Sequence, residues 1–150
     1  MAGNKQPVSV LVLLYSACGR VLLIERADKP GFWQSVTGSR EGQEALLATA
    51  WRELGEETGF SAADGVMHDW AQSSVYEIYP HWRHRYPEGV THNTEHVFAF
   101  ELSAEATPRL NAREHIAYVW LDWQEAAQRV FSPSNAVAIR ELGRRLSPLS

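Results

Sequence analysis

The sequence predicts an α+β protein in which helices pack on the faces of a mixed β-sheet. Segments with the apolar patterns of strands are mixed along the chain with segments of helical periodicity, and such elements bury their apolar faces against one another in layers. The chain has 150 residues, of which 45% are apolar, and this suits one domain with a substantial core. No repeat or linker-like stretch divides residues 1–150, so a single domain is expected.

The first predicted elements are strands. Residues 8–15 form a nearly continuous apolar run, which predicts a strand that is buried on both faces. Residues 16–19 read as a turn, and residues 21–25 as the returning strand. A polar segment then leads to a short strand at residues 33–36.

A helix is predicted to begin near Gln43 or Glu44 and to end at Gly59, a residue type common at helix C-termini. Its apolar stripe comprises Leu46, Leu47, Ala50, Trp51 and Leu54. Three glutamates follow at spacings of three and four: Glu53, Glu56 and Glu57. Such spacings put them on one face, beside the stripe, so we expect them where the helix meets the sheet.

The second half of the chain continues the mixture of strands and helices. Strand-like segments surround Trp70 and residues 75–76, and a loop-like lobe follows at residues 80–93. Two further strands are predicted at residues 96–102 and 116–121.

Two helices are predicted to complete the chain. Asp122 can cap a helix that runs to about residue 131. Ser132 and Pro133 then have the pattern of a cap and a first helical position, and this last helix is expected to end near Leu146.

The overall charge and the cysteine content exclude several functional classes. A net charge of -4 and a pI near 5.8 provide no global basic field, so no nucleic-acid or membrane partner is expected. The single cysteine, Cys18, excludes an internal disulfide and a cysteine-based zinc site, and we interpret it as an incidental thiol. The apolar run at residues 8–15 is too short to span a membrane and lacks a secretory cleavage site, so a cytoplasmic location is expected.

The three glutamates on one helix face suggest a metal site. Like charges at these spacings destabilise a helix by roughly 0.2–0.5 kcal/mol per pair. A cluster with that cost indicates a function, and carboxylates are the ligands that Mg2+ shares with waters and substrate phosphates.

The acids belong to a longer pattern at residues 38–60, which read GSREGQEALLATAWRELGEETGF. Gly38 precedes Glu44 by six positions, Arg52-Glu53-Leu54 follows, and then come Gly55, Glu56-Glu57, Thr58, Gly59 and Phe60. The pattern fills every fixed place of the Nudix box and is far more specific than a lone glycine motif, so the chain resembles the Nudix hydrolase family. The resemblance implies an α/β/α sandwich with a mixed sheet, and hydrolysis of a nucleoside diphosphate linked to another group.

The resemblance also implies roles for the box residues. Glu53 and Glu57 match the ligands of a divalent cation, Mg2+ with Mn2+ as the alternative. Glu56 is either a further ligand or the catalytic base that activates water, and we take it as the catalytic residue. Arg52 and Glu44 are expected to brace the loop and helix, and the missing side chain of Gly38 lets the backbone approach the metal.

Five segments outside the box read PVSVLVLLY, FWQSVTGS, HWRHRYPEGVTHNTE, EHIAYVWLD and SPSNAVAI. They resemble one bacterial subfamily, whose members remove pyrophosphate from 7,8-dihydroneopterin triphosphate in folate synthesis. Glu114 matches a third metal ligand supplied from outside the box. The positions that match substrate contacts are Lys5, Arg26, Thr37, Tyr76, Glu77, Ile78, Tyr79 and Ser132.

Each of these matches has a simpler structural alternative. The alternative for Glu114 is an exposed loop acid, and the alternative for Ser132 is a helix cap. Lys5 and Arg26 suit phosphate binding but could be ordinary surface charges. Alternate residues of a strand face opposite sides, so only part of the segment 76–79 is expected to touch a ligand. An aromatic there could stack on a pterin, and a carboxylate could accept hydrogen bonds from its amino-pyrimidinone edge.

The lobe at residues 80–93 is rich in basic and aromatic side chains, including His81, Arg83, His84, Arg85 and His92. A zinc cluster is disfavoured because no cysteine supports it. We expect the lobe to overhang the cleft and attract a polyphosphate, or to order the substrate side of the site.

Two other functions compete with the folate reaction. A general nucleotide-cleaning hydrolase acting on dATP or 8-oxo-dGTP would use the same box chemistry. The fold and the box do not determine which leaving group the enzyme accepts. A Nudix-like binding domain that has lost catalysis is disfavoured because every box acid is present. In either enzymatic case the expected partner is a small-molecule substrate, and a monomer suffices.

Overall fold

The computed structural model describes residues 3–147. A seven-stranded sheet has the order β3-β2-β1-β6-β5, with β4 paired to β1 and β7 paired to β2. The strands are β1 (Val8–Ser16), β2 (Arg20–Arg26), β3 (Trp33–Gln34), β4 (Val36–Ser39), β5 (Gly65–Glu77), β6 (His92–Leu102) and β7 (His115–Asp122). The helices are α1 (Leu46–Thr58), the 3-10 helix η1 (Pro80–Arg85), α2 (Trp123–Arg129) and α3 (Pro133–Leu146).

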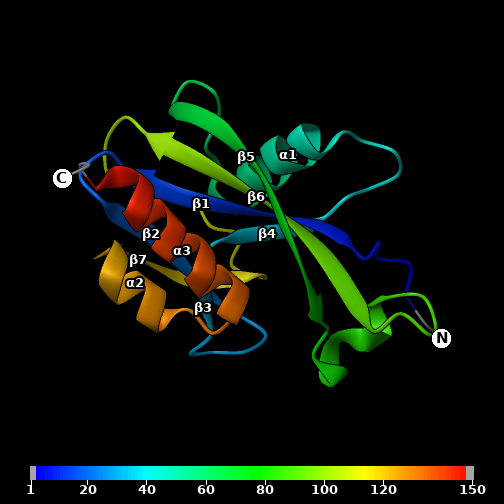
Figure 1. Ribbon diagram of the computed structural model, residues 1–150. Coiled ribbons are helices and arrows are strands. Elements are labelled where there is room, and N and C mark those ends of the chain that lie inside the picture. Colours follow the sequence, from blue (N-terminus) through cyan, green and yellow to red (C-terminus); the bar gives the residue numbers. More distant parts are fainter. Residues whose placement is uncertain (1–2, 148–150) are drawn as a thin grey trace.

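Helices cover both faces of the sheet, with α1 on one face and the pair α2 and α3 on the other (Figure 1). β1 pairs in parallel with β6, whereas its pairings with β2 and β4 are antiparallel, so the sheet is mixed. This is the α/β/α sandwich predicted from the sequence. Within the described residues 3–147, no helix is long and apolar enough to cross a membrane.

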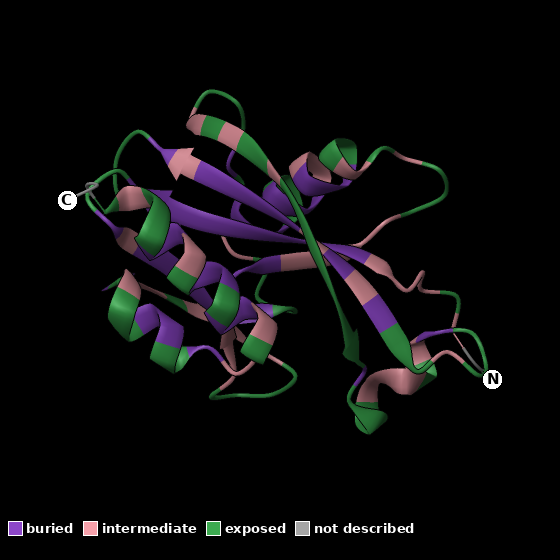
Figure 2. Cartoon of the chain, in the orientation of Figure 1, coloured by how far each residue is buried: buried purple, intermediate pink, exposed green. Residues whose placement is uncertain are grey.

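β1 lies at the centre of the molecule and is buried on both faces, as its apolar run predicted (Figure 2). Alternate residues point to opposite sides of a strand. Leu11 and Leu13 therefore join the core under α2 and α3, while Val10 and Val12 join the core under α1.

α1 begins two or three residues later than predicted and has Ala45 at its N-cap position. The Glu44 carboxylate instead accepts a hydrogen bond from the backbone N–H of Glu41 at 2.9 Å, which holds that segment as a loop. Leu47 was predicted in the buried stripe and is 47% exposed, because α1 covers only part of the sheet. The three glutamates were predicted to lie where the helix meets the sheet. This is right for Glu53 and Glu57, which are buried, whereas Glu56 is exposed.

The second half also differs from its predicted boundaries. β5 is one strand with a bulge between Asp69 and Gln72, and Ala71 adopts a positive φ of 53° there. The predicted lobe holds η1, and β6 begins at His92 rather than at residue 96 because it pairs with the whole end of β5. Asp122 occupies the N-cap of α2 without a capping hydrogen bond from its side chain.

α3 is fastened to the sheet by a buried polar pair beside the site. Ser132 caps the helix as predicted, since its hydroxyl accepts from the N–H of Asn135 at 3.4 Å. The Asn135 side chain accepts from the N–H of Ser35 and donates to the Ser35 hydroxyl, both at 2.9 Å. Asn135 is 1% exposed and Ser35 fully buried, so water cannot replace these bonds.

We expect Asn135→Ala to lower the free energy of unfolding by about 2–3 kcal/mol, because it leaves two buried groups of Ser35 without partners. Urea unfolding followed by circular dichroism measures the change. Val137→Ala, on the same helix and 63% exposed, serves as the control and should change stability by less than about 0.5 kcal/mol. Equal stability of the two variants would contradict a fastening role for Asn135.

Candidate active site

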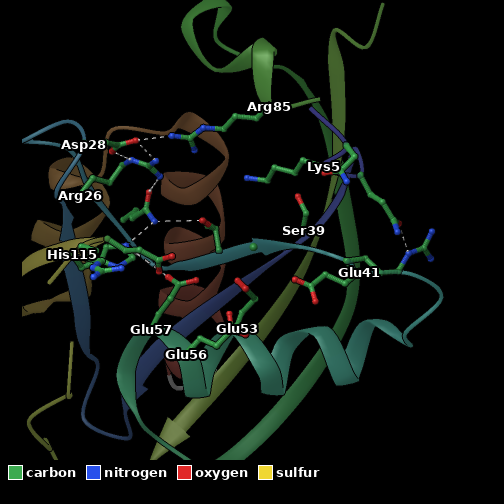
Figure 3. A pocket seen from close by; sticks show the side chains of 18 of the residues that line it. Lys5, Arg26, Asp28, Ser39, Glu41, Glu53, Glu56, Glu57, Arg85 and His115 are labelled. Carbon is green, nitrogen blue, oxygen red and sulfur yellow. Dashed lines mark hydrogen bonds and ion pairs between the residues drawn. The ribbon is translucent and has the colours of Figure 1, made fainter. Parts of the chain in front are cut away.

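A cleft of about 840 Å³ opens where α1 meets β4. Figure 3 shows its two sides: Glu53, Glu56 and Glu57 rise from α1 on one, and Lys5, Arg26 and Arg85 point in from the other. The cleft thus combines the two charge types that a metal-dependent phosphate reaction requires.

Glu53 and Glu57 form a pair of buried carboxyl groups. Glu53 is 9% exposed and Glu57 is 3% exposed. Burial, followed by repulsion from Glu56, raises the pKa of Glu53 to about 7. Burial, followed by repulsion from Glu53 and from Glu114, raises the pKa of Glu57 well above its usual range.

These residues fit a divalent cation. Glu57 Oε1 is buried and has no hydrogen-bond partner, which is costly for a charged group unless a cation satisfies it. A divalent cation between the two carboxylates would also relieve their repulsion. As the side chains lie, residues 3–147 contain no group of three His, Cys, Asp or Glu side chains arranged to hold a metal ion. A third carboxylate ligand therefore requires a side chain to turn towards the pair.

Glu114 lies on the exposed turn before β7. Its charge contributes to the raised pKa of Glu57, so it lies near the pair without being buried beside it. The next residue, His115, is 5% exposed and places its Nε2 3.8 Å from Glu57 Oε1. Burial lowers the pKa of His115 to about 4, so its imidazole is neutral and does not neutralise Glu57.

Arg52 and Glu44 brace the site, as the sequence predicted. The Arg52 guanidinium donates to the carbonyl oxygen of Ser39 at 2.9 Å and to Glu44 Oε1 at 2.6 Å. It also donates to Glu53 Oε1 at 2.9 Å, which fixes one oxygen of that carboxylate. One arginine thus joins the loop after β4 to the acidic face of α1.

The basic side of the cleft is partly neutralised by one acid. Arg26 forms two hydrogen bonds of 2.8 Å with Asp28, and Arg85 reaches the same carboxylate at 3.0 Å. The Arg26 hydrogen bond, above all, lowers the pKa of Asp28 to about 2. Burial, and then the charges of Arg85 and Arg26, lowers the pKa of Lys5. Arg26 and Arg85 share one close acid, and Lys5 adds a third positive charge to this side of the cleft. This arrangement suits a polyanionic ligand.

A second, more apolar cavity of about 250 Å³, which we call the inner cavity, adjoins the cleft. Five residues line both: Lys5, Arg26, Gln34, Thr37 and Arg85. The inner cavity is bounded by aromatic residues of the segment that joins β5 to β6 and by the start of α3. Tyr79 stacks on Trp82 with ring centroids 5.4 Å apart, and the Arg26 guanidinium lies 4.5 Å from the Trp82 ring centroid.

The structure brings the predicted site residues together in these two cavities. The box acids and Glu114 line the cleft. The eight residues matched to substrate contacts all line the inner cavity: Lys5, Arg26, Thr37, Tyr76, Glu77, Ile78, Tyr79 and Ser132. Arg85, Trp82 and Tyr86 of the predicted lobe also line it, whereas His81, His84 and His92 are exposed.

The residues of the site to which sequence reasoning gave no role include Asp28, Gln34, Glu95 and His115. Two of them left a signal in the sequence. Glu95 is a carboxylate in the inward phase of an alternating strand, two residues before the buried Val97. His115 directly follows the predicted ligand Glu114. Asp28 and Gln34 left no local signal, because their roles depend on Arg26.

The comparison with protein families matches residues 5–142 to the NUDIX domain. The dihydroneopterin triphosphate diphosphatase of Haemophilus influenzae is 39% identical over 144 residues, covering 94% of this chain and 90% of that protein. The enzyme of the same name from Escherichia coli K12 is 43% identical over 140 residues, covering 91% of this chain and 92% of that protein.

Among solved structures, the E. coli dihydroneopterin triphosphate pyrophosphohydrolase superposes with a TM-score of 0.87 at 42% identity. The match covers 93% of this chain and 96% of that one. The similarity therefore extends through both cavities and is not confined to the box.

Proposed function

This chain belongs to the NUDIX domain family, and from that premise we propose that it hydrolyses 7,8-dihydroneopterin triphosphate to the monophosphate and pyrophosphate, with Mg2+ as cofactor. The observation that carries the proposal is the pair of adjoining cavities. The charged cleft suits a triphosphate, and the aromatic inner cavity suits a flat bicyclic ring. The relatives that act on this substrate match the chain through both cavities.

The reaction breaks one phosphoanhydride bond. The oxygen of water bonds to one of the two phosphorus atoms, the bridging oxygen leaves with the other phosphate product, and one proton of the water passes to a base. We assign that base to Glu56, which is exposed in the cleft and lies 3.5 Å from Arg52. Glu53 and Glu57 would hold the cation, with Glu114 turning in as a third ligand. When bound, the cation supplies neutralisation of phosphate oxygens and acidification of water.

The other cleft residues bind and orient the substrate. Lys5, Arg26 and Arg85 lie between the two cavities, where the phosphate chain of a substrate seated in both would run. The stacked pair Tyr79 and Trp82 would hold the ring. We propose that the enzyme acts on a small molecule as a monomer in the cytoplasm. Its net charge of -4 also favours an enzyme without nucleic-acid or membrane partners.

We expect kcat/KM with Mg2+ to be at least about tenfold higher for 7,8-dihydroneopterin triphosphate than for dATP or 8-oxo-dGTP, a difference of about 1.4 kcal/mol in transition-state binding. Product release measured by chromatography compares the three substrates directly. A preference for either purine nucleotide would overturn the proposed substrate. Isotopically labelled water then shows which phosphorus is attacked, because the label enters either the monophosphate or the pyrophosphate.

A further inference from the structure

Glu95 is a buried carboxylate in the wall of the inner cavity. It lies on β6, opposite Ser9 of β1 and Ser74 of β5, and is 4% exposed. Its side chain lines the same cavity as Tyr76, Tyr86 and Ser134. Neither the box nor the segments that carried the family resemblance gave Glu95 a role.

The carboxylate of Glu95 has little compensation for its burial. Ser134 Oγ donates to Glu95 Oε1 at 2.9 Å, and the Ser132 hydroxyl lies 3.0 Å from that of Ser134. No ion pair within residues 3–147 includes Glu95. Burial raises the pKa of Glu95 to about 7. A buried acid with one hydroxyl partner weakens the fold, so its presence points to a ligand.

We propose that Glu95 is the residue that recognises the 2-amino-4-oxo-pyrimidine edge of the substrate ring, and this inference rests on the proposed function. That edge presents two adjacent donors, the ring N3–H and the 2-amino group. An ionised carboxylate is an acceptor on both oxygens and matches them with two charge-assisted hydrogen bonds. Because Glu95 is 4% exposed, water competes little for its carboxylate, and such hydrogen bonds discriminate strongly between rings.

The neighbouring acid Glu77 is less suited to this role. Its side chain is 68% exposed and lies 3.3 Å from the Arg83 guanidinium. A carboxylate that is open to water and already paired gains little from exchanging partners. Glu77 and Glu95 line the same cavity, so the two positions can be compared in one experiment.

The proposed contact predicts which rings the cavity rejects. Guanine offers the same pair of donors as the pterin, whereas adenine offers one acceptor and one donor. An ionised Glu95 therefore disfavours dATP but not dGTP. Glutamine offers one acceptor and one donor, so Glu95→Gln removes the preference for the pterin edge while keeping the size of the side chain.

We expect Glu95→Gln to lower kcat/KM for 7,8-dihydroneopterin triphosphate by about 10- to 100-fold, the range for losing hydrogen bonds to a charged group. kcat/KM for dATP should change by less than about threefold, or rise. Glu77→Gln should alter both values by similar factors, so that their ratio changes by less than about threefold. Glu101→Gln, on the same strand with its side chain 39% exposed and lining neither cavity, is the matched control.

The outcomes separate this inference from the proposed function. The role of Glu95 would be overturned if Glu95→Gln left the ratio of kcat/KM for dihydroneopterin triphosphate to kcat/KM for dATP unchanged. An equal loss of kcat/KM on both substrates is such a result. A change of the ratio in Glu77→Gln alone would transfer that role to Glu77. If the wild-type enzyme prefers dATP, the proposed function fails, and the dGTP to dATP ratio in Glu95→Gln still tests the contact.

A measurement on the wild-type enzyme tests the same contact without a variant. Glu95 gains its second acceptor only when ionised, so the dihydroneopterin triphosphate to dATP ratio of kcat/KM should rise several-fold between pH 6 and pH 8. The other charged groups that line the cavity are Lys5, Arg26, Glu77 and Arg85, and the other titratable groups are the phenols of Tyr76, Tyr79 and Tyr86. The three cations bind phosphates common to both substrates, so their effects cancel in the ratio. A ratio independent of pH in this range would contradict the proposal.

Stability gives a readout that is independent of turnover. The pKa of Glu95 is higher in the folded state than the usual 4.5, so its ionisation favours unfolding as pH rises from about 4.5 to about 7. Glu95→Gln should therefore melt at a higher temperature than the wild type at pH 8 and at nearly the same temperature at pH 4.5. This result would also show that the variant is folded.

Discussion

Glu57→Gln is expected to lower metal-dependent turnover by at least about a thousandfold, since a bound cation supplies several kcal/mol of charge stabilisation in phosphate chemistry. The same variant should be more stable than the wild type in the absence of metal. Glu57 is buried beside Glu53, and its raised pKa means that its ionisation opposes folding above the usual carboxyl range. Loss of function combined with a gain in stability is typical of a residue kept for its chemistry.

Thermal unfolding with and without MgCl2 checks the assignment independently of activity. Mg2+ should raise the melting temperature of the wild type, because a ligand that binds only the folded state stabilises it. The increase should be absent in Glu57→Gln. Glu125→Gln is the control, since its side chain is 59% exposed on α2, on the opposite face of the sheet. Near-normal turnover in Glu57→Gln would exclude Glu57 as a metal ligand.

The fold was predictable to the extent that local pattern decides it. The apolar run of β1 identified the central strand, and the spacing of the box acids beside the apolar stripe correctly predicted burial of Glu53 and Glu57. Leu47 shows the limit of periodicity, because a helical pattern does not reveal how wide a surface the sheet offers. The start of α1 was missed because the Glu44 side chain binds the loop instead of extending the helix.

Site residues that belong to a motif could be predicted from the sequence. Site residues whose roles depend on contacts between distant parts of the chain could not. Asp28 became part of the site by pairing with Arg26 and with Arg85, which is 57 residues away in the sequence. Glu95 has its hydrogen-bond partner because α3 brings Ser134 to β6. The roles of such residues depend on which elements are neighbours in space, and a single sequence does not state this. The roles of the box acids and the substrate contacts remain predictions that the proposed variants test.

Gly38→Ala is expected to lower turnover by about a hundredfold or more and to destabilise the fold by about 1–3 kcal/mol, the usual cost of overpacking. A Cβ at position 38 would collide with Cγ, Cδ and Oε2 of Glu53. Arg52 holds the same carboxylate at 2.9 Å, so the side chain cannot move aside without breaking that bond. The substitution therefore displaces the ligand carboxylate itself.

Gly55 is the matched control, because it is a second glycine of the same box with space for a side chain. A Cβ there meets only the carbonyl oxygen of Phe60, at an ordinary 3.9 Å. Gly55→Ala should raise stability by about 0.5–1 kcal/mol through helix propensity and leave turnover nearly unchanged.

The double variant Gly38→Ala/Glu53→Ala separates packing from chemistry. Removing the Glu53 carboxylate eliminates the collision, so the double variant should recover most of the stability that Gly38→Ala loses, while turnover stays low. Urea unfolding measures the stability of the two single variants and the double variant, and pyrophosphate release measures their turnover. If Glu53→Ala did not restore stability, the strain would lie in the backbone of β4. If the double variant regained turnover, the Glu53 carboxylate would not be needed for catalysis.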